Sequence, residues 1–187
     1  MKPLDIPAVV LDRVKYPHNL AAAIRACSCF GVKTLLWSGH RFEFVDGERL
    51  PREERMKGYS DVHVDVSERP FDKLLRRDDS RFMVPVCVEL TPSSTPLTDY
   101  VHPTYAVYVF GPEDGSVRSA WRGLCHEFVH IPAKHCLNLA AALNVVLADR
   151  VMKRQRDGLE HFHGWTPGEH EDRGAMEIAS VAGWDGK

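Results

Sequence analysis

The chain has 187 residues, of which 44% are hydrophobic and 27% charged, and its formal net charge at pH 7 is −2. These values are those of an ordinary soluble protein with one domain and a sizeable core. No apolar run reaches the ~18–20 residues that a membrane-spanning helix needs, and the N-terminus lacks a signal-peptide pattern, so we expect a cytoplasmic protein.

The N-terminal part of the chain alternates apolar runs with a helical pattern. Residues 8–11 (AVVL) are typical of a buried strand. The stretch from Asn19 to Gly31 predicts a helix with Asn19 near its N-terminus, alanine-rich packing faces and Gly31 as its C-terminal stop. One charge, Arg25, lies in the middle of this helix, and residues 32–37 predict a second strand.

The middle of the chain is less regular. Residues 40–58 are polar and contain a charge-dense piece that we interpret as a short exposed helix. Residues 61–66 (DVHVDV) alternate, which indicates a strand with one wet face. Residues 71–77 fit a short amphipathic helix. Residues 81–88 fit an apolar strand, which Pro85 weakens or places at the edge of a sheet.

The strongest strand pattern in the chain is at residues 105–110 (YAVYVF), after a segment at 91–98 that is a loop by composition. It runs directly into a Gly-Pro-Glu-Asp-Gly-Ser turn at 111–116. A short helix is predicted over 117–125 and a further strand over 128–131. Strands that alternate with helices in this way predict an α/β domain with a mainly parallel sheet.

The last predicted helix is apolar around nearly its whole circumference. Between Leu137 and Ala148 its only polar side chains are Asn138 and Asn144. Such a helix needs cover on more than one side, so it forms either the centre of the domain or a subunit interface. Its basic end returns it to water and complements the negative helix C-terminus, through Arg150, Lys153, Arg154 and Arg156.

The composition changes after Arg156. Residues 158–187 hold Gly, His and acidic residues with almost no apolar periodicity. We therefore predict a domain over residues 1–157 and an acidic C-terminal extension over 158–187, part of which we expect to be disordered. His161 and His163 in this extension are interpreted as exposed side chains rather than metal ligands.

The five cysteines are odd in number and irregularly spaced, which argues against a disulfide scaffold. Cys27 and Cys29 lie two residues apart on a predicted helix, so they point to different faces. We therefore predict no metal site at this pair.

Three clusters could carry chemistry, and each also has a purely structural interpretation. Asn19 with Arg25 could be a helix cap and an arginine that extends to solvent. The turn at 110–115 (FGPEDG) follows a strand, where α/β sheets bind ligands, although any tight turn favours the same residues. Residues 131–138 (IPAKHCLN) could simply connect a strand to a helix. Neither P-loop nor dinucleotide-binding spacing is present.

In this order the three clusters resemble the motifs of the SpoU (TrmH-like) branch of the SPOUT RNA methyltransferases. Residues 17–19 (PHN) with Arg25 are similar to the first motif, residues 110–113 (FGPE) to the second, and residues 131–138 to the third. The resemblance covers most of the chain. It is nearest to the short, single-domain members that modify tRNA.

The resemblance implies an α/β fold, with a mainly parallel sheet flanked by helices and a C-terminal trefoil knot that no periodicity argument predicts. It also implies a homodimer in which the first and last helices pack against their mates. The implied cofactor is S-adenosylmethionine, held by three loops. Its contacts would be Val88, Glu89, Leu90, Phe110, Gly111, Pro112, Glu113, Ile131, Ala133, Cys136, Leu137 and Asn138.

The implied reaction is methyl transfer to a ribose 2′-hydroxyl of RNA, with tRNA favoured over rRNA by analogy with the short members. Because the methyl sulfonium is already activated, the protein must place the 2′-oxygen in line and help to remove its proton. Arg25 would contact the target ribose or adjacent phosphate and favour the alkoxide, although an arginine is a poor base. Asn19, Glu113 and Asn138 complete the implied catalytic set, in which Glu113 and Asn138 hydrogen-bond to the loops and to Arg25.

The chain departs from the family pattern at four positions. Ala21 and Ser116 stand where glycine is usual, and Ala133 stands where methionine is common. Cys136 replaces a serine, and a thiol is a poorer hydrogen-bond donor than a hydroxyl, so a polar role there is weakened.

RNA binding requires a local basic patch rather than a basic whole chain, so a net charge of −2 does not exclude it. One candidate patch contains Arg52, and another contains Lys134, Arg150 and Arg154. With Arg25, these are the predicted RNA contacts, although both patches could equally be solvated faces. Two other functions stay open: a catalytically silent RNA-binding dimer, and a methyltransferase that modifies a base.

Overall fold

A computed structural model describes residues 5–38, 62–75 and 83–160. Its centre is a seven-stranded sheet with the strand order β3-β2-β1-β6-β4-β7-β5, and every pair of neighbouring strands is parallel. The strands are β1 (Ala8–Leu11), β2 (Thr34–Trp37), β3 (His63–Val66), β4 (Val84–Val88), β5 (Thr95–Pro96), β6 (Ala106–Phe110) and β7 (Glu127–His130).

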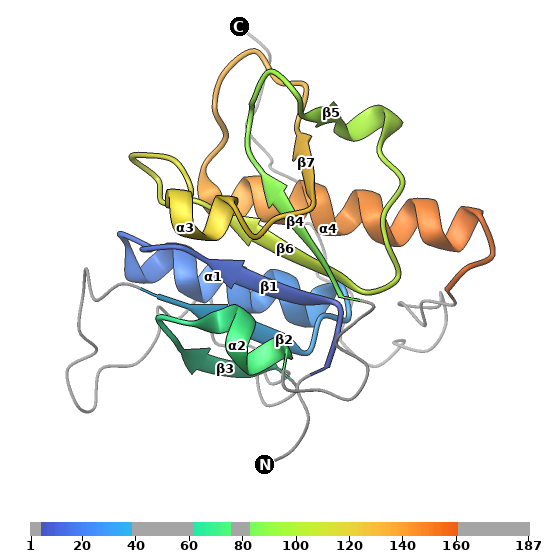
Figure 1. Ribbon diagram of the computed structural model, residues 1–187. Coiled ribbons are helices and arrows are strands. Elements are labelled where there is room, and N and C mark those ends of the chain that lie inside the picture. Colours follow the sequence, from blue (N-terminus) through green and yellow to red (C-terminus); the bar gives the residue numbers. More distant parts are fainter. Residues whose placement is uncertain (1–4, 39–61, 76–82, 161–187) are drawn as a thin grey trace, which may run out of the picture.

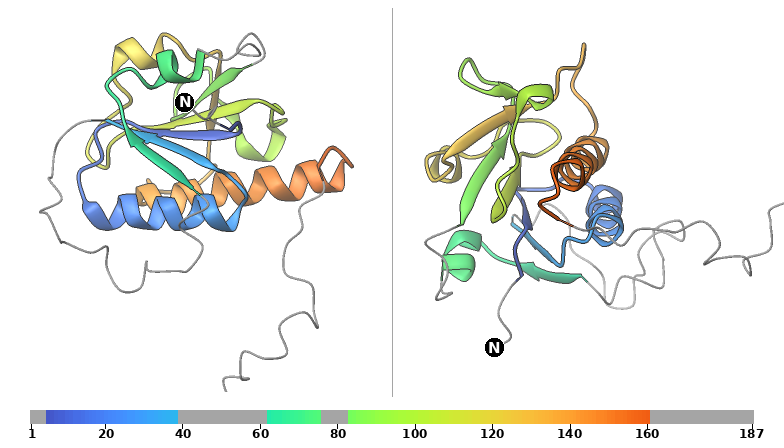
Figure 2. Two further views of the ribbon diagram at one scale, coloured as in Figure 1. Left: turned by 90° about the horizontal axis from the view of Figure 1, so that it is seen from below. Right: turned by 90° about the vertical axis from the view of Figure 1, so that its right-hand side faces the viewer.

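Helices cover both faces of the sheet (Figures 1 and 2). Helices α1 (Pro17–Cys29) and α4 (Leu139–Arg156) lie side by side on one face, and α2 (Pro70–Leu75) and α3 (Ser119–Arg122) lie on the other. A short 3₁₀ helix (η4, Leu97–Asp99) follows β5. The predicted α/β class with a parallel sheet is confirmed.

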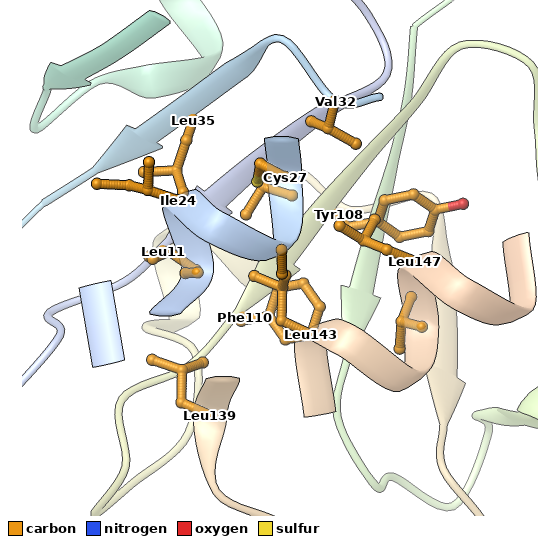
Figure 3. Packing of buried hydrophobic residues seen from close by; sticks show 14 of the residues in the cluster. Leu11, Ile24, Cys27, Val32, Leu35, Tyr108, Phe110, Leu139, Leu143 and Leu147 are labelled. Atoms are coloured by element: carbon orange, nitrogen blue, oxygen red, sulfur yellow. The ribbon is translucent and has the colours of Figure 1, made fainter. Parts of the chain in front are cut away.

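The larger part of the core lies between the sheet and the α1–α4 pair (Figure 3). Ile24 and Cys27 from α1 and Leu143 and Leu147 from α4 pack there against strand residues such as Tyr108. The opposite side chains of the same strands form a second cluster beneath α2 and α3. Strands buried on both faces need continuous apolar runs, which explains why β1 (AVVL) and β6 (AVYVF) show no alternation of apolar and polar residues.

The parallel arrangement brings the ends of four central strands to one edge of the sheet. The segments that leave β1, β4, β6 and β7 therefore start from the same edge. In open α/β sheets this edge is where ligands bind, most often where successive strands diverge to opposite sides of the sheet. Here β1 is followed outward by β2 and β3, whereas β6, β4 and β7 lie on its other side.

The first helix differs from its prediction at its N-terminus. It begins at Pro17, with Tyr16 as the N-cap and no side-chain capping bond, so Asn19 lies inside the first turn and is not a cap. Proline suits this position because its missing N–H is not needed there. Gly31 has φ = 71° just past the helix end, which confirms it as the stop.

The prediction that Pro85 weakens β4 or marks it as an edge strand is wrong, because β4 pairs with both β6 and β7. Val84 donates its N–H towards β6, to the carbonyl oxygen of Tyr105, so the N atom of Pro85 faces the other side. Pairing with β7 begins only at Val86, which lies opposite Glu127. The missing N–H therefore costs no ladder bond.

Three other segments differ from their predictions. The segment expected to be a loop at 91–98 contains β5 and the start of the 3₁₀ helix, and the helix expected over 117–125 is confined to Ser119–Arg122. Residues of β3 are exposed or half-buried throughout, rather than on one face, because β3 is an edge strand.

The predicted helix in 40–58 and the C-terminal extension lie mainly outside the described residues, as does Arg52. The trefoil knot stays a prediction. In the three described ranges, no helix is both long and apolar enough to cross a membrane.

Candidate functional site

A pocket of about 510 Å³ lies where the loops after β4, β6 and β7 meet the start of α4. Eleven of the twelve residues predicted to contact a cofactor line it: Val88, Glu89, Leu90, Phe110, Gly111, Pro112, Glu113, Ile131, Ala133, Cys136 and Leu137. The structure thus brings together at one pocket loops that are separated by up to about forty residues.

The sequence interpretation missed part of the lining. Gly115, Ser116 and Val117 extend the turn after β6, and Leu139 and Ala142 come from the first turn of α4. The helical spacing of Leu139 and Ala142 next to the third motif could have indicated them. His130 and His135 also line the pocket; His135 lies within the third motif and His130 directly precedes it, but neither was predicted as a contact.

Asn138 is the one predicted contact that does not line the pocket among the described residues; it caps α4 instead. Its side-chain oxygen accepts hydrogen bonds from the N–H groups of Ala140 (2.9 Å) and Ala141 (3.3 Å). Its side-chain NH₂ group donates to the Asn19 amide oxygen at 2.9 Å. Asn138 therefore fixes where the third motif ends and where α4 begins.

Asn19 joins all three motifs. Besides accepting from Asn138, it donates to Glu113 Oε1 at 2.6 Å, and it is only 2% exposed. The Glu113 carboxylate also accepts from the backbone N–H groups of Lys15 (2.8 Å) and Tyr16 (3.4 Å). This chain of bonds satisfies both polar ends of a buried amide, as a buried polar group requires.

The turn after β6 is unusually close-packed against itself. A side-chain carbon added at Gly111 would lie 2.9 Å from the backbone nitrogen of Val117. The Glu89 carboxylate accepts from the Val117 N–H (3.3 Å) and lies 3.7 Å from Arg122. Glycine at 111 is therefore required for the shape of the pocket wall.

The predicted basic residues are placed very differently from one another. Lys134 is exposed and lines the pocket. Arg25 is exposed on α1 and is not among the described residues that line the pocket. His18 and Cys29, which share its helix face, are exposed as well, whereas Cys27 is buried, so the two cysteines point to different faces, as predicted.

The prediction that Arg150 and Arg154 bind RNA is wrong, as is the prediction that they return α4 to water. They are only 3% and 4% exposed, and both pair with Glu160. Arg154 also donates to the carbonyl oxygen of His102 at 2.9 Å. The two arginine side chains are buried and paired with Glu160, because the chain turns back towards α4 at that residue.

The residues that depart from the expected motifs lie in the core or at the pocket. Ala21 is a fully buried residue of α1, and Ser116 and Cys136 both line the pocket. The thiol of Cys87, behind the pocket, has its pKa raised by the neighbouring Cys125 thiol and by burial, so it stays protonated and is no nucleophile. No group of three or more possible metal ligands is found in the described part of the chain.

Comparison with known proteins gives one family. The sequence model of the SpoU rRNA Methylase family matches residues 7–148, most of the chain. Among curated proteins, no sequence matches this chain.

Solved structures share the fold at low sequence identity. The structure described as the A. aeolicus TrmH/SpoU tRNA modifying enzyme is 22% identical, with a TM-score of 0.68, and the match covers 81% of this chain and 77% of that one. The SpoU methyltransferase AviRb from Streptomyces viridochromogenes, in complex with AdoMet, is 22% identical (TM-score 0.62; 83% and 67% covered). A structure described in terms of 2-OH methylation of C/U34 on tRNA is 18% identical (TM-score 0.62; 81% and 96% covered).

Proposed function

Because the chain belongs to the SpoU rRNA Methylase family, we propose that it is an S-adenosylmethionine-dependent methyltransferase that modifies a ribose 2′-hydroxyl of RNA. The observation that carries the proposal is the convergence of the three motifs on one pocket through Asn19, Glu113 and Asn138. Their separation in sequence makes chance assembly of this pattern improbable.

The residues of the pocket fit the cofactor. A volume of about 510 Å³ falls within the ~300–1,000 Å³ range of sites that enclose ligands of this size. Val88, Leu90 and Phe110 offer apolar surface for the adenine ring of the cofactor. Glu89 offers a carboxylate to a positively charged group of the cofactor. The AviRb structure with bound AdoMet, which has the same fold, supports this assignment.

When bound, S-adenosylmethionine supplies an activated methyl group, so the chain's own residues need only bind, orient and exclude water. Glu113 and Asn19 hold the turn after β6 against α1, and Asn138 holds the third motif against the same helix. Lys134 at the pocket can attract an RNA phosphate. We propose that Arg25 contacts the target ribose or its phosphate when RNA is bound.

We further propose a homodimer formed through the outer face of the α1–α4 pair. Ala141, Val145 and Met152 lie at helical spacing on α4 and are exposed. Val145 is 39% exposed and Met152 is 62% exposed, which is unusual for such side chains on one helix face.

We propose tRNA rather than rRNA as the substrate. The structure described for C/U34 of tRNA is covered over 96% of its length by this chain, so it has no large additional domain that this chain lacks. The family name refers to rRNA, and the experiment below therefore offers both RNAs.

The test is transfer of labelled methyl groups from S-adenosylmethionine to bulk tRNA and rRNA, with an Arg25→Ala variant as the control. We expect incorporation into tRNA that resists alkaline cleavage at the modified nucleotide, since only ribose methylation blocks the 2′-hydroxyl. Label in an alkali-sensitive product would indicate a base methyltransferase. RNA binding without any transfer, unaffected by Arg25→Ala, would indicate a silent RNA-binding dimer.

A further inference from the structure

One wall of the pocket is a loop, Gly111 to Val117, whose two ends are held by a single residue outside the pocket. The Asp12 N–H donates to the carbonyl oxygen of Phe110 at 2.8 Å, just before the loop. The Asp12 Oδ2 atom accepts from the N–H of Arg118 at 2.7 Å, just after it. Asp12 therefore closes the neck of this loop, although it does not line the pocket itself.

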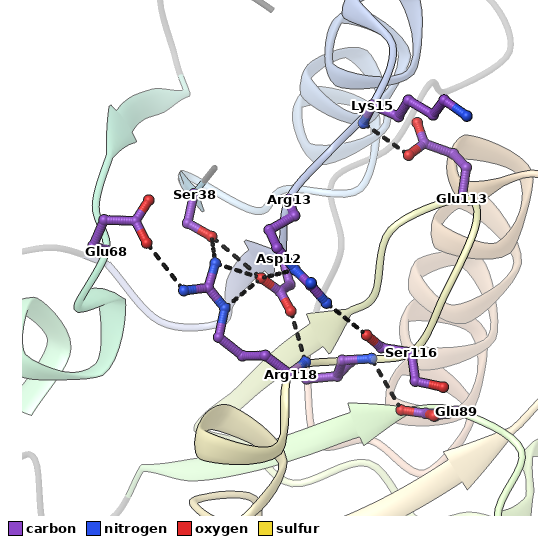
Figure 4. Close-up of polar contacts among 10 residues, drawn as sticks. Asp12, Arg13, Lys15, Ser38, Glu68, Glu89, Glu113, Ser116 and Arg118 are labelled. Atoms are coloured by element: carbon purple, nitrogen blue, oxygen red, sulfur yellow. Dashed lines mark hydrogen bonds and ion pairs between the residues drawn. The ribbon is translucent and has the colours of Figure 1, made fainter. Parts of the chain in front are cut away.

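Asp12 is fully buried, and its charge is compensated by two arginines (Figure 4). Arg118 donates from Nε to Oδ1 at 2.7 Å, and Arg13 Nε lies 3.3 Å from the same oxygen. Arg118 is held in turn by Glu68 (3.0 Å) and by Ser38 (2.7 Å), at the ends of β3 and β2. Because a buried charge that loses its partner is costly, this arrangement strongly favours one position of the neck.

The residue after Asp12 adds a second attachment. Arg13 adopts a left-handed backbone, with φ = 51°, which is uncommon for a residue other than glycine. Its Nη2 atom donates to the carbonyl oxygen of Ser116 at 3.0 Å, inside the same loop (Figure 4). A strained backbone here directs the side chain onto the pocket wall.

We propose that Asp12 and Arg118 are positioning residues for cofactor binding. By closing the neck, they set where the backbone of Gly111, Ser116 and Val117 lies along the pocket. This inference rests on the proposed function, because it takes S-adenosylmethionine as the ligand of that pocket. A loop that recognises a ligand through backbone groups loses affinity when it moves by a fraction of an ångström to 1 Å.

The test is the affinity for S-adenosylmethionine, measured by titration calorimetry without RNA, in Asp12→Ala and Asp12→Asn. We expect Asp12→Ala to weaken the affinity by about tenfold or more. Asp12→Asn keeps an oxygen for the Arg118 N–H but loses the charge, so an intermediate loss is expected. Glu160→Gln is the matched control: it removes the carboxylate that pairs with two buried arginines under α4, away from the pocket. It should lower thermal stability but keep the affinity within about twofold.

A positioning role also predicts a kinetic and a dynamic signature. In Asp12→Ala the KM for S-adenosylmethionine should rise, while kcat and the KM for RNA at saturating cofactor change little. The Arg118 amide should exchange with solvent faster than in the wild type. An unchanged cofactor affinity in Asp12→Ala, or in Asp12→Asn if the alanine variant does not fold, overturns the proposal. A wild-type chain that binds the cofactor but methylates no RNA contradicts only the proposed function, whereas one that binds no cofactor overturns both.

Discussion

Asn19 is the residue on which the three motifs depend most directly. Replacing it with alanine leaves Glu113 and Asn138 each without one partner, and an unsatisfied buried group costs ~1–3 kcal/mol. We therefore expect Asn19→Ala to lower the free energy of unfolding by about that amount and to weaken cofactor binding. Urea unfolding and calorimetry measure the two effects.

Asn144→Ala is the matched control for Asn19→Ala, because Asn144 is exposed and bonds only locally, to the carbonyl oxygen of Ala140 in the structure described. A loss within ~0.5 kcal/mol is expected there. Equal losses in the two variants would contradict the role given to Asn19.

The two glycines of the loop after β6 make a second matched pair. A Cβ at Gly111 would lie 2.9 Å from the Val117 nitrogen, which cannot move without opening the neck, whereas a Cβ at Gly115 would meet a Pro112 side-chain atom at an ordinary 3.5 Å. We expect Gly111→Ala to weaken S-adenosylmethionine binding by about tenfold or more and Gly115→Ala to have little effect. Equal affinity in both variants would show that the close approach is not needed.

At this scale the sequence could predict residues whose type is tied to a motif, such as Asn19 and Glu113. It could not predict Asp12, because its role depends on Arg118, over a hundred residues away. The same limit explains Arg154: a basic residue at a helix end normally faces water, and only the return of the chain at Glu160 buries it.

Helix α4 is held in its C-terminal half by a buried histidine from the loop before β6. His102 contacts the Tyr108 hydroxyl (2.6 Å) and the Asp149 carboxylate (2.9 Å), and burial lowers its pKa below the ordinary 6.5, although Asp149 opposes the shift. The unfolded chain thus takes up the proton at higher pH than the folded one. The stabilisation is present above pH 6.5 and is lost as the pH falls towards the lower, folded-state pKa.

We expect the urea midpoint of the wild type to decrease as the pH is lowered from 7 to 5 and expect His102→Gln to reduce this dependence. Urea titrations followed by the helical circular dichroism signal at each pH measure this dependence. An identical pH dependence in His102→Gln would exclude His102 as its source.

Among the elements, β1 and α1 were predictable because their apolar patterns and the Gly31 stop are local signals. The position of β4 was not, because whether Pro85 is tolerated depends on where β7 starts to pair with its neighbour. The 3₁₀ helix after β5 escaped prediction because TPSSTPLT has the composition of a loop.

At the scale of the whole molecule, the exposed residues Ala141, Val145 and Met152 on α4 predict that two copies of the chain associate. Val145→Glu with Met152→Glu should convert the proposed homodimer into monomers, since a charge in an apolar interface is unfavourable. Light scattering coupled to size exclusion measures the mass. Leu124→Glu is the control, because Leu124 is 52% exposed but lies beside α3, on the other face of the sheet. A wild-type monomer, or a dimer that survives the double substitution, would contradict the proposed interface.

The distances along the chain between site residues have a consequence for how the protein is made. Arg118, which donates a hydrogen bond to Asp12, is synthesised 106 residues after it. Asn138, which donates to Asn19, is synthesised 119 residues after that residue. Strand β1 also gains its β6 neighbour only after a long stretch of synthesis, because Ala8 pairs with Val107 and Leu11 with Phe110. Contacts this distant form late, so a nascent chain released before α4 has a partial sheet but no pocket. Capture of the cofactor thereby distinguishes a finished molecule from an interrupted one.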